Sequence, residues 1–427
     1  MATILKVKTI KLKETLQTTQ VMHWLQQQTG PVFAWEDPAR TQRLFASGVA
    51  LQPPVSKLTF AAARQWFQNL SQQLILTPSS SWHDVKAVGS FLFDEADGRT
   101  QNWGPLSGGL LFVPHILVHY QKQQWRLTLI DADSSAIDQL GQELKNQPAL
   151  PAQQGCIDAY HEINPQAWTH SVQQALDCIH QHQLAKVVLA RTAQAHVQQS
   201  VPESLWLQLR QQHPHIYHIL LRDHDTSFIS ATPERLVRMQ PQRLLTGALA
   251  GTTQRTGNLS TDQALAQQLL HDDKNLAEHK LVVDWLDQRL RALGLRVSHE
   301  AQPRILATAN LQHLYTPIVA RGLYDPLKVL AALHPTPALA GTPQRLAQKI
   351  IRQLEPQSRG LYGAPVGYLS LDQEGEWAVG IRSGLLTDQE LTLWGGAGIV
   401  KASQPASELQ ETTHKLQSLL SIFQIKD

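Results

Sequence analysis

The 427-residue chain has a composition typical of a globular protein, with 42% hydrophobic and 17% charged residues. Lysine and arginine number 37 against 35 acidic residues and form no basic block, which argues against a nucleic-acid-binding protein. Cys156 and Cys178 are the only cysteines, too few for a disulfide framework or a paired-cysteine zinc site.

The first 150 residues alternate short apolar runs with turns, which predicts a strand-rich region with helices near 59–75 and 134–146. The N-terminus lacks a continuous apolar signal segment, and no run reaches the ~18 residues of a membrane span. We therefore expect a cytoplasmic protein that folds without a membrane or an obligatory protein partner. A polar, proline-containing segment at 145–155 is the predicted boundary between regions 1–150 and 160–425.

Beyond this boundary, the pattern predicts a mixture of helices and consecutive strands. The expected helices lie at about 166–184, 262–293, 325–333, 343–354 and in the last segment, and the expected strands lie near 185–197, 215–222, 227–231, 235–239, 243–250, 362–371, 376–386 and 390–400. Runs of consecutive strands, without strict alternation of strand and helix, favour an α+β protein with antiparallel sheets backed by helices.

The segment GGAGIVKASQPASELQETTHK at 395–415 is the most informative part of the chain. Its glycines allow a ligand to approach the backbone, and Pro405 marks the start of a helix. Glu408, Glu411 and Lys415 are spaced three and four residues apart, so they share one helix face. The alternative is a solvated helix whose Glu411–Lys415 pair contributes only ~0.3 kcal/mol.

Four other charged residues occupy unusual positions. Lys186 opens the apolar strand KVVLAR, where burial near a second cation favours a neutral amine that can act as a base; the alternative is a strand-end lysine that reaches solvent. Glu234 follows Pro233 where one strand ends and another begins, as a turn residue also would. Glu278 lies about 160° from the apolar side of its helix, which indicates exposure. Arg382 interrupts an apolar strand and suits a carboxylate partner.

The sequence contains no motif for a nucleotide or transition-metal cofactor. The nineteen histidines show no metal-binding spacing, and the glycines match neither the dinucleotide fingerprint nor a phosphate-binding loop.

Eight motifs in one order resemble the chorismate-utilising enzymes. They are KVVLAR (186–191), SATPERL (230–236), LAGT (249–252), AEH (277–279), HPTPALAG (334–341), RGLYGAPVGY (359–368), GIRSG (380–384) and GGAGIV…SELQETTHK. The resemblance covers about 160–425, and within the family the isochorismate synthases of menaquinone biosynthesis are the most similar. It implies a central sandwich of antiparallel sheets with helices outside.

The resemblance also implies a reaction, a metal and a set of site residues. The expected reaction is the Mg2+-dependent isomerisation of chorismate to isochorismate, by attack of water at C2 and loss of the C4 hydroxyl. Glu278 and Glu411 would bind Mg2+ with Glu408 nearby, and oxygen ligands suit this hard cation. Lys186 would act as the general base and Glu234 as the general acid. The remaining implied contacts are His334 near the leaving hydroxyl and Gly251, Tyr368, Arg382, Gly396 and Lys415 with the substrate.

Several alternatives within and outside the family stay open. Lys186 favours water as the nucleophile, since the similar ammonia-using enzymes have a different residue there. Ala250 stands where related aminodeoxychorismate synthases carry a nucleophilic lysine, and Asn275 stands where several relatives place an acid. A salicylate synthase would share the same catalytic positions, a siderophore-pathway isochorismate synthase would share the reaction, and an inactive chorismate-binding protein is the non-enzymatic alternative.

Overall fold

A computed structural model describes residues 4–13, 15–131, 134–198, 201–308 and 311–425 of the chain. Its α-helices are α1 (Thr18–Gln26), α2 (Phe60–Asn69), α3 (Ser134–Asn146), α4 (Pro165–His180), α5 (Pro202–Gln212), α6 (Leu259–Leu270), α7 (Asp273–Ala292), α8 (Pro326–Leu333), α9 (Gln344–Leu354) and α10 (Pro405–Leu420). Short 3-10 helices span Leu70–Gln73, Trp82–Asp84 and Gln101–Leu106.

The strands are β1 (Leu5–Lys11), β2 (Val32–Glu36), β3 (Gln42–Leu51), β4 (Leu74–Leu76), β5 (Lys86–Ser90), β6 (Leu110–Gln121), β7 (Gln124–Ile130), β8 (Cys156–Glu162), β9 (Lys186–Gln198), β10 (Tyr217–Asp223), β11 (Thr226–Thr232), β12 (Arg235–Gln240), β13 (Arg243–Gln254), β14 (Arg296–His299), β15 (Arg304–Ala307), β16 (Leu311–Arg321), β17 (Gly341–Thr342), β18 (Pro365–Ser370), β19 (Gly375–Val379), β20 (Ser383–Thr387), β21 (Glu390–Val400) and β22 (Gln424–Ile425).

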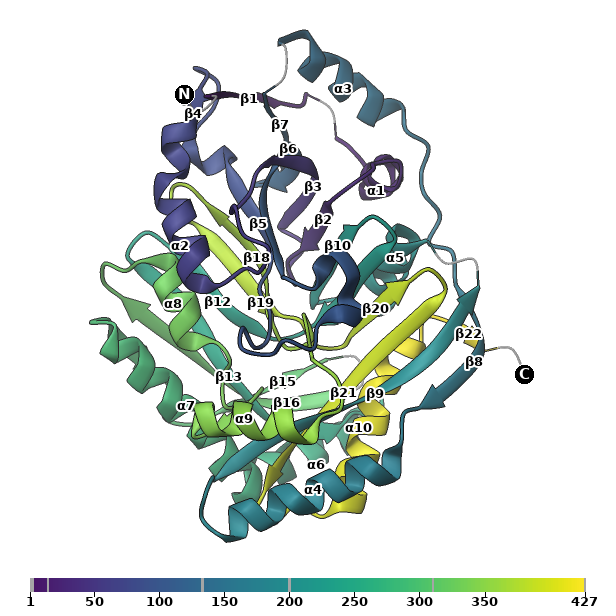
Figure 1. Cartoon of the computed structure of the whole chain (residues 1–427), viewed down its shortest axis with the longest axis vertical. Helices are drawn as coiled ribbons and strands as arrows, with labels where there is room; N and C mark the ends of the chain where they lie inside the picture. Colours follow the sequence, from purple (N-terminus) through teal and green to yellow (C-terminus); the bar gives the residue numbers. More distant parts are fainter. Residues whose placement is uncertain (1–3, 14, 132–133, 199–200, 309–310, 426–427) are drawn as a thin grey trace.

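Two largely antiparallel sheets form the centre of the molecule (Figure 1). The first sheet has the order β4-β1-β7-β6-β3-β2-β10-β11-β20-β21-β9-β8-β22, and only the pairs β1–β4 and β8–β22 are parallel. The second sheet runs from β14 and β15 through β16, β13, β12, β19, β18 and β5 to the start of β6. Strand β6 therefore passes from one sheet into the other.

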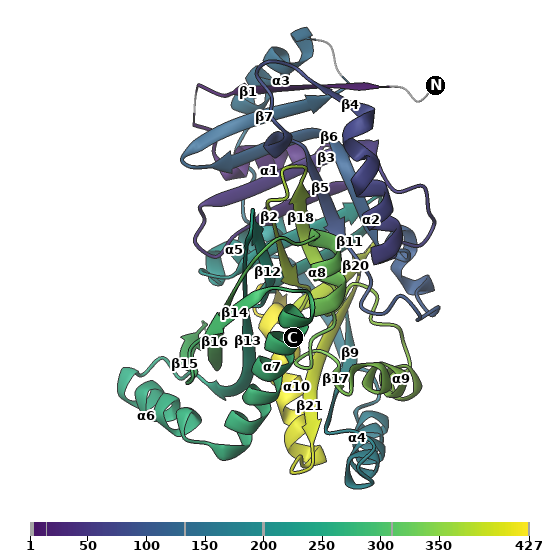
Figure 2. The ribbon, with the colours of Figure 1, turned by 90° about the vertical axis from the view of Figure 1, so that its left-hand side faces the viewer.

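Helices cover the outside of this sandwich. Helices α2, α8, α9 and α4 follow one side of the molecule, where Figure 2 shows them one above another. Apolar side chains fill much of the space between the layers. Strand β9 is buried on both faces over its first eight residues, and its Val187 and Leu189 pack in the hydrophobic core. The predicted α+β fold with antiparallel sheets and outer helices is confirmed.

Two predicted elements are divided in the structure. The helix expected over 262–293 is α6 followed by α7, because Asp272 accepts a hydrogen bond from the Asn275 backbone and starts a new helix. The strand expected over 376–386 is β19 followed by β20, because the backbone turns at Arg382, whose φ is 49°.

Both sheets cross the predicted boundary near residue 150. Strand β2 pairs with β10 in the first sheet, and β5 pairs with β18 in the second. Regions 1–150 and 160–425 are thus joined by main-chain hydrogen bonds, and their division into domains stays a prediction. Within the described ranges, the helices are all too short or too polar to cross a membrane.

Candidate active site

One cavity lies where the two sheets meet α7 and α10. All but two of the predicted site residues line it, namely Lys186, Glu234, Gly251, Glu278, Arg382, Gly396, Glu408, Glu411 and Lys415. These residues come from β9, the β11–β12 turn, β13, α7, the β19–β20 turn, β21 and α10. The fold therefore gathers groups that are more than 200 positions apart in the sequence.

The pairing of β9 with β21 forms one wall of the cavity. Lys186 lies opposite Val400, and Val188 lies opposite Gly398, so the lysine projects over the glycine-rich end of β21. A Cβ atom built on Gly398 would lie 2.9 Å from Lys186 Cε and 3.3 Å from Glu278 Oε1. Glycine at this position thus makes room for the lysine and its carboxylate partner.

Lys186 forms a buried ion pair across the cavity with Glu278 of α7. The distance between Lys186 Nζ and Glu278 Oε1 is 2.6 Å, and the lysine side chain is only 1% exposed. The Glu278 side chain is 18% exposed. We expected Glu278 to be exposed, and this prediction was wrong, because the face of α7 that carries Glu278 lines the cavity.

Helix α10 directs its two glutamates and a lysine into the same cavity. Lys415 Nζ lies 2.5 Å from Glu411 Oε1 and donates to the Gly396 carbonyl at 2.8 Å. Burial opposes ionisation of Glu411, but the charge and hydrogen bond of Lys415 prevail and lower its pKa. Burial raises the pKa of Glu408, and the charge of Glu411 adds to this effect.

Glu234 is the carboxyl group with the most altered acidity in the cavity. It is 8% exposed, and burial raises its pKa to about 7 even though Lys186, Arg382 and Lys415 favour the ionised form. At neutral pH the group is therefore divided between its acid and its carboxylate, as a general acid requires.

Arg382 presents a guanidinium group to the cavity from a left-handed turn. Its φ of 49° is uncommon for a residue with a side chain, and burial lowers its pKa. Its guanidinium makes no hydrogen bond or ion pair with any residue that the structure describes. Such a group suits a carboxylate ligand, which would supply its missing counter-charge.

Three further cavity residues were not singled out from the sequence. His313 donates or accepts a hydrogen bond with Thr252 through Nδ1 at 2.9 Å, and burial, with Arg382 and Lys415, lowers its pKa to about 3. Its Nε2 has no hydrogen-bond partner among the described residues. Tyr362 and Lys274 also line the cavity. Lys274 had a signal in the helical spacing, because it precedes Glu278 by four residues on the same helix face, and Tyr362 lies in the motif RGLYGAPVGY.

The structure does not bring His334 and Tyr368 to this cavity. His334 Nε2 lies 2.9 Å from the Phe93 carbonyl, and burial lowers the pKa of its imidazole to about 4. Tyr368 lies within β18 and packs edge-on against Trp35, with ring centroids 5.3 Å apart. The alternation of side chains along a strand turns Tyr368 away, whereas Tyr362 in the preceding turn reaches the site.

The carboxylates in the cavity are the kind of ligand that a hard divalent cation prefers. Glu278, Glu408 and Glu411 offer only oxygen ligands, which Mg2+ prefers. In this structure Glu278 and Glu411 each contact a lysine ammonium group instead, so two cations already occupy positions beside the carboxylates. The residues therefore have the chemistry that the metal requires, and the two lysines would compete with it for the carboxylates.

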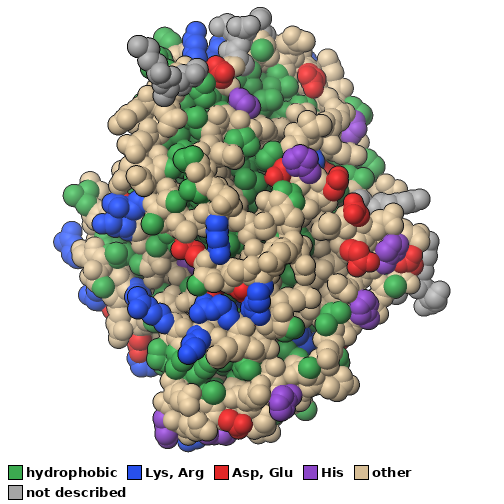
Figure 3. Space-filling model, in the orientation of Figure 1, with side chains coloured by type: hydrophobic (Ala, Val, Ile, Leu, Met, Phe, Trp, Pro, Cys, Tyr) green, Lys and Arg blue, Asp and Glu red, His purple; other side chains and the backbone are tan. Residues whose placement is uncertain are grey.

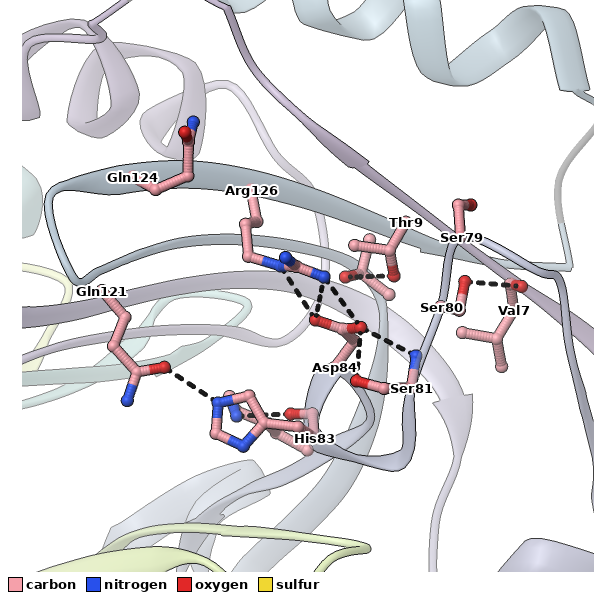
Figure 4. A network of polar contacts seen from close by, with 12 residues as sticks. Val7, Thr9, Ser79, Ser80, Ser81, His83, Asp84, Gln121, Gln124 and Arg126 are labelled. Carbon is pink, nitrogen blue, oxygen red and sulfur yellow. Dashed lines mark hydrogen bonds and ion pairs between the residues drawn. The ribbon is translucent and has the colours of Figure 1, made fainter.

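Among the described residues, a different trio has ligand atoms within 4.8 Å of one another, namely His83, Asp372 and Glu374. It lies outside the cavity in a polar network, and Figure 4 shows part of that network: His83 beside Gln121, and Asp84 held by Arg126 and Ser81. His83 Nδ1 already contacts Asp372 Oδ2 at 2.9 Å, so hydrogen bonding accounts for this cluster without an ion.

One face of the molecule carries many positive charges at its surface. Lys and Arg side chains gather over α7, α8 and α9 on the face shown in Figure 3. Such a field attracts anions and raises their rate of encounter with the protein.

Replacement of Gly398 by alanine tests the geometry of the Lys186–Glu278 pair. The added Cβ must displace the lysine, so we expect kcat to fall by about tenfold or more while the melting temperature changes little. Gly98→Ala is the matched control, because a Cβ there meets no atom within 4 Å. Equal steady-state rates for the two variants would contradict the proposed contact.

Comparisons with known proteins show which proteins the chain resembles. The family model described as "Chorismate binding enzyme" matches residues 3–424. The chain is 32% identical to isochorismate synthase MenF of Bacillus subtilis, over 78% of this chain and 73% of that protein. It is 33% identical to the salicylate biosynthesis isochorismate synthase of Pseudomonas aeruginosa, over 93% of this chain and 85% of that protein.

A solved structure shares the whole architecture. The menaquinone-specific isochorismate synthase MenF from Escherichia coli superposes with a TM-score of 0.84 and 27% sequence identity, over 99% of this chain and 96% of that one.

Proposed function

The chain belongs to the family of chorismate binding enzymes, and from that premise we propose that it converts chorismate to isochorismate. The reaction adds water at C2 of the ring and removes the C4 hydroxyl, so the double bonds shift without oxidation or reduction. The relatives named above, in two bacteria, are isochorismate synthases, which supports this assignment.

The single observation that carries the proposal is the presence of an acid and a base in one cavity. Glu234 has a pKa of about 7, raised by burial, and acts as the general acid that protonates the departing hydroxyl. Lys186 acts as the general base toward the attacking water. The Lys186 side chain is only 1% exposed, and its contact with Glu278 holds the amine at the cavity.

Bound Mg2+ would hold a substrate carboxylate and polarise the conjugated ring. Glu278 and Glu411 are its proposed ligands, with Glu408 close by, and all three line the cavity. Arg382, Lys415 and the backbone at Gly251 and Gly396 are the proposed contacts of the substrate. His334 and Tyr368 have no such contact in this geometry, so we assign their expected positions to His313 and Tyr362, which line the cavity.

Product analysis tests the proposed function. Purified protein is incubated with chorismate and Mg2+, with and without ammonium, and the products are separated by chromatography. We expect isochorismate alone in both samples. Release of salicylate with pyruvate would identify a salicylate synthase, an aminated product would identify an ammonia-using enzyme, and unchanged chorismate would leave only a binding role.

Removal of divalent cations should abolish the reaction. Because Glu278 and Glu411 then remain paired with Lys186 and Lys415, we expect treatment with EDTA to reduce the rate below detection and added Mg2+ to restore it. Restoration should fail in a Glu411→Gln variant, whereas Glu390→Gln, at an exposed position on β21, should respond like the unmodified protein. A full rate in EDTA would contradict the metal assignment.

We also propose that the product supplies menaquinone biosynthesis. The Bacillus subtilis relative and the Escherichia coli structure carry names of this pathway, whereas the Pseudomonas aeruginosa relative is named for salicylate. A strain that lacks its own menaquinone-specific enzyme should regain menaquinone when it expresses this chain. The cytoplasmic location and the lack of an obligatory protein partner remain predictions.

A further inference from the structure

A second cavity lies behind the active site, between α4, β9 and the segment that follows α9. Its volume is about 380 Å3, within the range of small-molecule sites. The indoles of Trp168 and Trp394 form part of its walls, together with Ile163, Leu354 and Pro356. Polar side chains of Asn164, Ser171, Gln353 and Gln357 also line it.

The charged groups of this cavity are already neutralised by partners in the protein. Arg191 Nη1 lies 2.6 Å from Glu162 Oε2, and Glu355 Oε2 accepts a hydrogen bond from Arg359 Nε at 2.9 Å. A strongly charged ligand would therefore find no free counter-charge. Arg191 lies over the Trp168 ring, 6.0 Å from its centroid, and Trp394 stacks on Trp103 and Tyr362. The rest of these two indole rings, with amide and hydroxyl groups nearby, suits a flat ring with polar substituents.

The walls of the second cavity also contact the elements that carry the active-site residues. Arg191 holds α10 through Thr412 Oγ1 and Thr413 Oγ1, each at 2.7 Å, and both residues follow Glu411 directly. Glu355 accepts a hydrogen bond from the Ala190 backbone of β9 at 2.7 Å and pairs with Arg359, which lines the active-site cavity.

A third contact joins the two cavities through a side chain that they share. Trp394 lines both, and its ring stacks on Tyr362, with centroids 6.0 Å apart and an interplanar angle of 17°. A ligand that moves Trp394 would also move Tyr362, which stacks on it. A ligand that moves Arg191 or Glu355 would likewise move α10 or β9, to which these side chains are hydrogen-bonded. A ligand in the second cavity thus has a physical means of altering the first.

We propose that the second cavity is an effector site for an uncharged, planar aromatic molecule with hydroxyl or carbonyl substituents, and that its occupancy changes the affinity of the active site. The binding itself is independent of the isochorismate synthase proposal, and only an effect on turnover rests on it.

Calorimetric titration of the full chain with 2-naphthol tests the binding. We expect saturable binding at one site with a Kd below about 1 mM. Decahydro-2-naphthol, which has the same skeleton and hydroxyl but no aromatic ring, should bind at least tenfold more weakly. Absence of saturable binding, or equal binding of the two probes, would overturn the proposal.

Two variants on α4 test whether 2-naphthol binds in the second cavity. Ala167→Trp fills the cavity from an exposed position on the helix and should weaken the binding of 2-naphthol at least tenfold. Gln174→Trp is exposed on the same helix but outside the cavity, and this variant should bind 2-naphthol like the unmodified protein. Ala167→Leu, with a smaller added side chain, replaces Ala167→Trp if that variant melts early. Unchanged binding in the variants at 167 would refute the location.

The coupling is measured without turnover. Saturating chorismate should change the Kd of 2-naphthol at least twofold, and 2-naphthol should change the Kd of chorismate by the same factor, because coupling between sites is reciprocal. In active protein, 2-naphthol should also change kcat/KM for chorismate, and Ala167→Trp should remove the effect. Independent affinities would overturn the effector role, and failure of turnover alone would count only against the proposed reaction.

Discussion

Replacement of Lys186 by alanine should reduce kcat for chorismate by about 10³-fold, with little effect on folding. General base catalysis contributes on the order of 10² to 10⁴ in rate, and within the described cavity no other residue faces Glu278 at ion-pair distance. The measurement is the steady-state rate of isochorismate formation at saturating chorismate and Mg2+, with the circular dichroism spectrum recorded for both proteins.

Two controls separate the role of Lys186 as a base from its charge. Lys186→Arg keeps a positive charge next to Glu278 but cannot give up a proton, so it should be as slow as Lys186→Ala. Lys328→Ala removes an exposed lysine of α8 and should leave the rate unchanged. A Lys186→Arg variant with more than about a tenth of the normal rate would exclude proton transfer by this residue.

Replacement of Glu234 by glutamine should also reduce the rate, by about 10² to 10⁴-fold, because the departing hydroxyl then lacks its proton donor. The acid form of Glu234 is the active one, and its pKa is about 7. The kcat/KM of the unmodified protein should therefore fall as the pH rises above about 7. A flat profile between pH 6 and 9 would contradict the role of Glu234 as the acid.

The same variant should make the protein more stable at alkaline pH. The folded protein holds the Glu234 proton up to about pH 7, whereas the unfolded chain releases it near 4.5. Stability is therefore lost as the pH rises from about 4.5 to about 7, and glutamine does not share this loss. We expect Glu234→Gln to raise the free energy of unfolding by about 3 kcal/mol at pH 8 and by much less at pH 4.5.

Denaturant unfolding at both pH values measures this difference. A variant that is slower and yet more stable at pH 8 cannot owe its lost activity to a damaged fold. Glu390→Gln, at an exposed position, should show no pH-dependent gain. An equal change in stability at pH 4.5 and pH 8 would show that Glu234 does not retain its proton in the folded state.

Much of the fold could be predicted from local patterns. The apolar run of β9 and the strand end, proline and helical spacing of 395–415 predicted β9, β21 and α10 with small errors at their ends. These elements follow rules of side-chain period and backbone stiffness that act within a few residues. The division of 262–293 into α6 and α7 was missed, because Asp272 was not identified as a helix cap.

The residues of the site were less predictable than the elements that carry them. The periodicity of α7 showed that Glu278 points away from the core, but it could not show whether a cavity or solvent lies there. The motif RGLYGAPVGY contains two tyrosines. The alternation of side chains along β18 places Tyr368 on Trp35, whereas Tyr362 in the preceding turn lines the cavity. His313 had no pattern that set it apart from the other histidines.

The sequence by itself determined the fold class, the family and the residue types available for chemistry. These depend on local periodicity and on motifs whose order is written along the chain. The tertiary structure alone decided which charges face one another, such as Lys186 with Glu278, and which carboxyl group keeps its proton. Distances and burial arise when strands and helices far apart in the sequence pack together, so no local pattern contains them.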